Sequence, residues 1–327
     1  MILCNLNTRV LQDITKLEIP QDSEANYTHI CSFDECYNNS IYFIGRKALK
    51  HKLDCLMSKQ SIIFVEDEIK IEHHSDDSVL VYVQNVRKIM TEILIYIDSK
   101  FDQSLVNEKE YYFTEKNAKI HRTSIIEKNS ILSANVYIGP YVYVGQNVIV
   151  GENTRILAGA KISRNTIIGN NCLIRENCVI GGNGFGIEKD ENGNNIRIPH
   201  LGGVRIGDYV EIGALSTVCS GTIKPTCIGN YVKIDDHVHI GHNNIIEDNS
   251  IITSGAILGG SVHIGKNGWV GINSTVKESI IVGSGSLIGM ATCVNKNIKN
   301  NATVFGNPSR ELVDFVKIQR KLDSFLK

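Results

Sequence analysis

Three histidines lie within six residues of one another in the segment DDHVHIGHN, residues 235–243. Imidazole titrates near physiological pH, so it can accept a proton from a nucleophile, bind a metal ion or position a polar substrate. If Ile240 points into a hydrophobic core, His239 and His242 point outward, where a substrate or a neighbouring subunit can contact them. Any one of these histidines could be an ordinary surface residue, but the cluster favours a functional site.

The histidine segment belongs to a long six-residue repeat of aliphatic residues. Such a residue recurs at every sixth position from Ile120 to Ile180, again from Ile206 to Val218, and in a shifted phase from Ile228 to Val294, at twenty-six positions in all. Neither an α-helix nor an ordinary strand has this period, whereas a parallel β-helix places one hexad on each of three flat sides. We therefore predict a mainly β protein, a left-handed parallel β-helix of about nine coils, in which residues about 18 apart lie one above another.

The pattern changes on either side of the repeat. Residues 1–105 are predicted to form a small α/β domain, residues 106–303 the β-helix, and residues 304–327 a turn and a helix. In the first region we expect strands at 41–44, 61–65 and 79–83 and helices at 47–59 and 86–96. The C-terminal helix would cap the solenoid or contact another subunit, through Leu312, Phe315, Leu322 and Phe325 at helical spacing.

Two insertions interrupt the hexads. Residues 183–203 (NGFGIEKDENGNNIRIPHLGG) contain turn-forming residues and are predicted to form a β-hairpin arm, and residues 219–227 (CSGTIKPTC) shift the phase of the repeat. A regular solenoid supplies mainly a scaffold, so function is expected where loops interrupt it. The histidine segment directly follows the second insertion.

Composition narrows the classes of function. The 327 residues carry 34 Lys and Arg against 35 Asp and Glu, and this balance argues against a nucleic-acid-binding protein. No apolar run is long enough to span a membrane. The nine cysteines include no Cys-x-x-Cys pair, and the start at Met1-Ile2-Leu3 shows no secretory leader, so we expect reduced thiols and a cytoplasmic protein.

Together, the α/β start, the hexads, and the segments NGFG, IPHLGGVRIGDYVEIGA and VKIDDHVHIGHNN resemble the UDP-3-O-acylglucosamine N-acyltransferase family of lipid A biosynthesis. The resemblance implies a homotrimer with active sites in the clefts between subunits. It also implies that His242 is the catalytic base and that the backbone N–H of Gly260, one coil further on, binds the acyl carbonyl. Such groups suit the attack of a sugar amine on a thioester.

Other residues are expected to complete this site. Asp235 or Asp236 would orient the imidazole. The donor's acyl group would lie beside Gly260, Trp269 and Met290. The residues that we expect to bind substrate are Asp236, His237, His239, Asn243, Asn183, Phe185 and His200.

The chain also departs from the family pattern. Ser279 stands where the family has a second histidine, and Phe43–Leu49 lacks the aromatic stack and the amide that clasp uracil. The ending VFGNPSREL is similar to that of coenzyme-A-dependent sugar acetyltransferases, which favours acyl-CoA over acyl carrier protein as the co-substrate. We therefore expect N-acylation of a dTDP- or UDP-linked amino sugar for a bacterial surface glycan, without a metal or a permanently bound cofactor.

Three alternatives remain open at this point. The first is the lipid A enzyme itself. The second is a zinc enzyme resembling γ-class carbonic anhydrases, with His237, His242 and His200 as ligands. The third is a scaffold that has kept the shape of the family and lost its chemistry.

Overall fold

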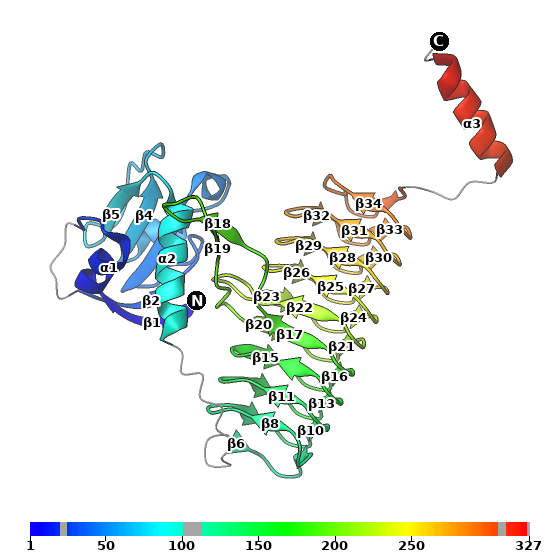
Figure 1. Cartoon of the computed structure of the whole chain (residues 1–327), viewed down its shortest axis with the longest axis horizontal. Coiled ribbons are helices and arrows are strands. Elements are labelled where there is room, and N and C mark those ends of the chain that lie inside the picture. The colour runs from blue at the N-terminus through cyan, green and yellow to red at the C-terminus, as the bar shows by residue number, and fades with distance from the viewer. Residues whose placement is uncertain (20–24, 101–112, 307–311, 326–327) are drawn as a thin grey trace.

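The hexads fold into very short strands that stack in three parallel sheets, as the computed structural model of residues 1–19, 25–100, 113–306 and 312–325 shows (Figure 1). Each strand pairs with the strand one coil away. In the regular coils Ile138, for example, lies opposite Ile120 on one side and Ile156 on the other, a spacing of 18 residues. The predicted mainly β fold, a parallel β-helix with a small α/β domain and a C-terminal helix, is confirmed.

We number the three sides of this prism from the one that contains β7. Among the described residues, the first face holds ten strands: β7 (Lys119–Ile120), β10 (Tyr137–Ile138), β13 (Arg155–Ile156), β16 (Leu173–Ile174), β21 (Glu211–Ile212), β24 (Lys233–Ile234), β27 (Ile251–Ile252), β30 (Trp269–Val270), β33 (Leu287–Ile288) and β35 (Thr303–Val304). In the same ranges the second face holds nine: β8 (Ile125–Ile126), β11 (Tyr143–Val144), β14 (Lys161–Ile162), β17 (Val179–Gly182), β22 (Thr217–Cys219), β25 (His239–Ile240), β28 (Ile257–Leu258), β31 (Thr275–Val276) and β34 (Cys293–Val294). The third face also has nine described strands: β6 (Phe113–Thr114), β9 (Ile131–Leu132), β12 (Ile149–Val150), β15 (Thr166–Ile168), β20 (Val204–Ile206), β23 (Thr226–Ile228), β26 (Ile245–Ile246), β29 (His263–Ile264) and β32 (Ile281–Val282).

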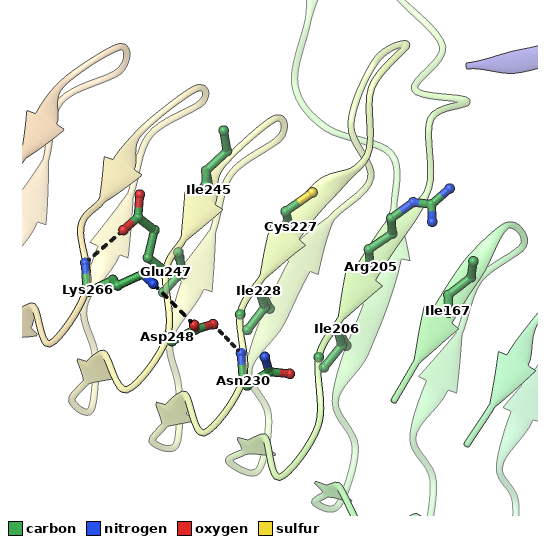
Figure 2. A pocket seen from close by; sticks show the side chains of 13 residues that line it. Ile167, Arg205, Ile206, Cys227, Ile228, Asn230, Ile245, Glu247, Asp248 and Lys266 are labelled. Carbon is green, nitrogen blue, oxygen red and sulfur yellow. Dashed lines mark hydrogen bonds and ion pairs between the residues drawn. The ribbon is translucent and has the colours of Figure 1, made fainter. Parts of the chain in front are cut away.

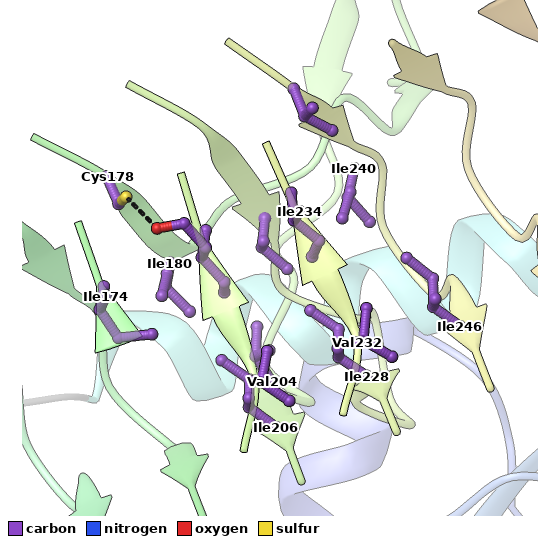
Figure 3. Packing of buried hydrophobic residues seen from close by; sticks show 14 of the residues in the cluster. Ile174, Cys178, Ile180, Val204, Ile206, Ile228, Val232, Ile234, Ile240 and Ile246 are labelled. Atoms are coloured by element: carbon purple, nitrogen blue, oxygen red, sulfur yellow. Dashed lines mark hydrogen bonds between the residues drawn. The ribbon is translucent and has the colours of Figure 1, made fainter. Parts of the chain in front are cut away.

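The aliphatic residue of each hexad points into the prism. Ile174, Ile180, Ile206, Ile240 and their equivalents form one continuous buried cluster (Figure 3). Burying a side chain of this size stabilises the fold by about 1.5–3 kcal/mol. The core therefore fixes which residues face outward in every coil.

Many corners of the prism need a residue in the left-handed backbone conformation, and asparagine often supplies it. Asn135, Asn153 and Asn171 all have positive φ, and their side-chain amides donate hydrogen bonds to one another from coil to coil. Asparagine tolerates this conformation better than most residues with a Cβ atom. The corners are thus defined by sequence, and so is the position of any side chain beside them.

In its described residues, the N-terminal domain is a five-stranded sheet of order β1-β2-β3-β4-β5 with two α-helices. Its elements are β1 (Ile2–Asn7), α1 (Thr8–Thr15), β2 (Asn26–Ile30), β3 (Ser40–Ile44), η1 (Arg46–Lys50), η2 (Asp54–Met57), β4 (Ile62–Glu66), β5 (Val79–Val83) and α2 (Val86–Ser99). The predicted strands at 41–44, 61–65 and 79–83 and the helix at 86–96 are present. The first strand, first helix and second strand were not predicted.

The prediction of one helix at 47–59 is wrong. Two short 3₁₀ helices, η1 and η2, occupy this segment, and His51 between them is extended. Because His51 is extended, a continuous helix cannot pass through it, and Cys55 N donates instead to the carbonyl of Phe33, which is distant in sequence, at 3.1 Å.

Both insertions leave the prism at the same corner, where the second face turns into the third. The first runs from β17 to β20 and forms a hairpin of β18 (Ile187–Lys189) and β19 (Asn195–Arg197), as predicted. The second runs from β22 to β23. We call this edge the insertion corner.

The N-terminal domain docks on these insertions (Figure 1). Ile198 and Leu201 of the arm are buried in the core of that domain, and Ile223 of the second insertion packs against it. Lys224 Nζ lies 2.5 Å from Asp34 Oδ2, which makes an ion pair across the contact. The domain is therefore held beside the insertion corner.

The C-terminal helix α3 (Leu312–Phe325) lies apart from the last coils (Figure 1), so the prediction that it caps the solenoid is wrong. Ile318, Leu322 and Phe325 are exposed on it. The side chains of Leu312 and Phe315 and the turn residues Asn307 and Pro308 lie outside the described part of the structure. A contact between subunits stays a prediction for this helix. In the described ranges, no helix has the length and apolar character needed to cross a membrane.

Candidate active site

His242 and Gly260 lie in consecutive turns of the insertion corner. His242 follows β25 and Gly260 follows β28, and these two strands pair in register. A Cβ atom added to Gly260 would lie 2.5 Å from His242 Nε2, so the ring covers the glycine. The spacing predicted from the hexads therefore brings the imidazole and this backbone together, and only glycine leaves room for the ring.

The backbone N–H of Gly260 donates to no recorded acceptor within the described residues. At several other corners the matching N–H is bound by a side chain from another coil: Ala214 N donates to Asp236 Oδ1 and Ser254 N donates to Asp235 Oδ2. The amide beside His242 is thus a hydrogen-bond donor that the protein itself leaves available. Donors of this kind stabilise an oxyanion when they are held in place before it forms.

Asn243 fixes the tautomer of the neutral imidazole. His242 Nδ1 lies 2.9 Å from Asn243 Oδ1, and the same oxygen accepts hydrogen bonds from Thr222 N at 3.2 Å and Thr222 Oγ1 at 2.9 Å. Because Asn243 Oδ1 is an acceptor, His242 Nδ1 must carry the proton and Nε2 must carry the lone pair. The basic nitrogen therefore faces Gly260.

The expectation that Asp235 or Asp236 orients the imidazole is wrong. Asp236 accepts from Arg175 and from the backbone of Ala214, and Asp235 accepts from Asp236 N and Ser254 N. These contacts lie at the corner between the first and second faces. Asn243, which adjoins the histidine and is anchored by the second insertion, takes this role instead.

A second histidine lies against the first. The rings of His200 and His242 are 4.8 Å apart between centroids, and His200 is buried. Burial, followed by the nearby His242, lowers the pKa of His200 to about 4, so this ring is neutral at physiological pH. His200 Nδ1 donates to the carbonyl of Ile198, and Gly184 lies against the His200 ring and the Cβ atom of His242. The arm thus forms one wall of the site.

Other predicted residues are distributed as follows. Asn183 Oδ1 accepts from His200 N, so it shapes the arm. His239 projects from the second face and is bonded to Thr217, and His237 is exposed at the corner between the first and second faces. His237 therefore does not join His200 and His242, and within the described residues no three His, Cys, Asp or Glu side chains converge as a metal site.

Trp269 and Met290 are not brought together with Gly260 inside one chain. Trp269 is on β30 of the first face, and Met290 is at the corner that follows β33. Both are exposed. The structure instead places an open groove of about 460 Å³ on the third face, where Ile245, Cys227, Arg205 and Ile167 follow one another in successive coils (Figure 2).

Sequence reasoning missed three residues of this site. Thr222 donates two hydrogen bonds to Asn243 Oδ1, as described above. The carbonyl of Lys224 accepts a hydrogen bond from Asn243 Nδ2 at 3.3 Å. Arg197 lies on the arm beside Phe185. Their positions inside the two insertions were the available signal, but nothing in the repeat says which insertion residue turns toward the histidine.

Comparisons with known proteins agree with the repeat. Residues 147–182 match the bacterial transferase hexapeptide family (six repeats). A curated relative from Legionella pneumophila (strain Lens), UDP-3-O-acylglucosamine N-acyltransferase 2, is 45% identical over 148 residues, which are 45% of this chain and 43% of the relative. The UDP-3-O-acylglucosamine N-acyltransferase of Coxiella burnetii (strain RSA 493 / Nine Mile phase I) is 50% identical over 82 residues, 25% of this chain and 24% of the relative.

Among solved structures, the UDP-N-acetylglucosamine acyltransferase from Campylobacter jejuni is 26% identical with a TM-score of 0.49, and the match covers 63% of this chain and 77% of that chain. By fold and repeat, the protein is a hexapeptide-repeat β-helix protein. Its curated relatives are named acyltransferases, and the chain spans less than half the length of those it matches.

Proposed function

We propose that this chain is an N-acyltransferase that moves an acyl group from a thioester to the amine of a nucleotide-linked amino sugar. The observation that carries the proposal is the juxtaposition of His242 Nε2 with the Gly260 amide at the insertion corner. The names of the curated relatives support the same chemistry.

The reaction would proceed by attack of the neutral sugar amine on the thioester carbon. His242 Nε2 takes the proton that the nitrogen loses as the C–N bond forms, while Nδ1–H stays on Asn243. The Gly260 N–H donates to the carbonyl oxygen as it becomes negative. Collapse of this intermediate breaks the C–S bond, and the imidazolium returns its proton to the leaving thiolate.

The acceptor that the relatives favour is a UDP-linked 3-O-acylglucosamine, as in the lipid A alternative, ahead of the dTDP- or UDP-linked sugar of a surface glycan. The segment Phe43–Leu49 offers little to a base: Phe43 is buried and stacked on Phe64, and Arg46 is paired with Glu68. The nucleotide is therefore expected to depend on residues outside this segment.

The acyl chain of the donor would lie in the groove on the third face. Ile245 is three residues from His242, and Cys227, Arg205 and Ile167 follow it along the groove in the next three coils. Of the charged groups that line the groove, Lys266 is paired with Asp248, at 3.7 Å between Lys266 Nζ and Asp248 Oδ2. An apolar floor suits an acyl chain from either acyl-CoA or acyl carrier protein.

A turnover assay tests the proposal. Purified protein is incubated with UDP- and dTDP-linked amino sugars, with and without a 3-O-acyl group, and with acyl-CoA or acyl carrier protein of several chain lengths. Mass spectrometry is then used to detect the amide. We expect turnover with a UDP-linked amine and at least one thioester. Absence of amide with every pair would contradict the proposal and favour the scaffold alternative. The mass of the protein in solution checks the expected homotrimer independently.

A further inference from the structure

Arg197 and Phe185 form an exposed cationic and aromatic platform on the arm. The Arg197 guanidinium carbon lies 5.4 Å from the centre of the Phe185 ring, and Arg197 Nη1 donates to the carbonyl of Gly184 at 3.0 Å. Phe185 is 77% exposed, so most of its ring is open to a ligand. Contact with the ring and the carbonyl holds the guanidinium in one place before any ligand binds.

This platform lies next to the proposed base. Gly184, which accepts a hydrogen bond from Arg197 and precedes Phe185 in the chain, lies against the His200 ring and the Cβ atom of His242. Burial and the nearby His242 lower the pKa of His200, and the charge of Arg197 adds to this effect. Burial raises the pKa of Cys219, at the start of the second insertion, and the charge of Arg197 partly offsets it. A group bound by Arg197 would therefore be a close neighbour of the reacting atoms.

Arg197 has no carboxylate partner in the part of the chain that the structure describes, whereas three arginines elsewhere in the protein do. Arg46 pairs with Glu68, Arg164 with Asp98, and Arg175 with Asp236. One hydrogen bond to a carbonyl uses a single N–H of the five that a guanidinium carries. The remaining donors form a fork that matches a phosphate group.

We propose that Arg197 and Phe185 bind a nucleoside diphosphate, with the guanidinium on the pyrophosphate and the phenyl ring against the base or the sugar. This inference rests on the proposed function in one respect: the proposed substrates are what would supply the nucleoside diphosphate. A nucleotide sugar and coenzyme A both contain a nucleoside diphosphate, so either substrate could supply it. Bidentate contacts of Arg with phosphate, together with stacking on an aromatic ring, are well suited to this chemistry.

Calorimetric titration with UDP, dTDP and coenzyme A tests the inference on the full chain. Arg197→Ala is expected to weaken at least one of these ligands about tenfold to a hundredfold, because a hydrogen bond to a charged group is lost. Arg197→Lys, which keeps the charge and loses the fork, should fall between Arg197→Ala and the wild type. Arg155→Ala is the matched control, since Arg155 also lies over an aromatic ring, Tyr137, but on the first face.

The outcomes separate the source of the ligand from the inference itself. A loss confined to UDP or dTDP assigns the site to the acceptor, and a loss confined to coenzyme A assigns it to the donor. Equal affinity of Arg197→Ala and wild type for all three ligands would overturn the inference, and so would binding of none by the wild type at millimolar concentration. Amide formation measured in parallel tests the proposed function separately: turnover with unchanged nucleotide affinity refutes this site alone, and an Arg197-dependent affinity without turnover refutes the proposed function alone.

Discussion

At the scale of single residues, the account depends on one nitrogen and one amide. The Asn243 oxygen, which accepts from Thr222, leaves His242 only one neutral tautomer, and the available lone pair faces Gly260. The glycine is required by space, since any Cβ atom there would meet the ring at 2.5 Å. The proposed base and the proposed oxyanion donor are therefore held together by contacts that can each be removed.

Gly260→Ala should displace the imidazole and lower kcat by about a hundredfold, since both the base and the amide lose their geometry. Gly193→Ala on the tip of the arm is a control for the substitution itself, because a Cβ atom there meets nothing within 4 Å, although its positive φ carries a modest strain. Steady-state kinetics of both variants and the wild type measure the change in kcat. Activity of Gly260→Ala equal to that of the control would show that the ring is not held against this glycine.

His200 predicts a pH dependence of stability. Its pKa is lowered from 6.5 to about 4 in the folded protein, mainly by burial, so protons bind the unfolded chain more readily. The free energy of unfolding should therefore fall as the pH decreases from about 6.5 to about 4 and lose no more through this group below that, with a total effect of about 3 kcal/mol.

Urea denaturation at several pH values, for wild type and for His200→Gln, measures this effect. The amide of glutamine can still donate to the carbonyl of Ile198. The variant should show a shallower loss of stability between pH 6.5 and 4. Identical slopes for the two proteins would mean that His200 is charged in the folded state or does not titrate in this range.

At the scale of elements, the candidate active site lies along the insertion corner. The arm, the second insertion, the turn at His242 and the turn at Gly260 follow one another in neighbouring coils along one edge of the prism. The third face, which adjoins this edge, carries the groove that begins at Ile245. Each element thus supplies one wall of a single site.

Ile245→Trp should shorten the acyl chain that the enzyme accepts, because a larger side chain fills the groove next to the reacting carbon. Ile257→Trp is the matched control: Ile257 is exposed to a similar extent, 47% against 45% for Ile245, but lies on the second face. Competition between thioesters of different length measures the preference. An unchanged preference in Ile245→Trp would place the acyl chain elsewhere.

The elements also show how far the sequence leads. The hexads determine the strands, the inward residues and the stacking of His242 on Gly260, because burial leaves one choice per hexad. The hydrogen-bond partner of His242 could not be predicted, because Asp235, Asp236 and Asn243 are all near it in sequence. Which of them contacts the ring depends on Thr222, which binds Asn243 in the folded protein. The split of 47–59 into two short helices depends in the same way on contacts distant in sequence.

At the scale of the whole molecule, the N-terminal domain and the prism meet at the loop that anchors Asn243. Ile223 packs on the core of the domain, Lys224 pairs with Asp34, and the backbone carbonyl of Lys224 accepts from Asn243. Docking of the domain and orientation of the imidazole therefore depend on the same three residues, Thr222, Ile223 and Lys224.

Reversal of one charge in the pair between Asp34 and Lys224 tests this link. Lys224→Glu should lower kcat by up to about fivefold, since a half-exposed ion pair contributes about 1 kcal/mol or less. The double variant Asp34→Lys with Lys224→Glu should recover most of that loss. Recovery in the double variant separates a positioning role from a merely local disturbance, whereas two additive losses would argue against the link.

The most direct test of the central claim is the kcat of His242→Ala in the acyl-transfer assay, compared with His239→Ala, which removes a neighbouring imidazole that does not face Gly260. The account predicts a fall of about a hundredfold or more for His242→Ala and little change for His239→Ala. A His242→Ala variant that retains more than about a tenth of the wild-type kcat would contradict general-base catalysis and leave the imidazole only a role in orienting substrate.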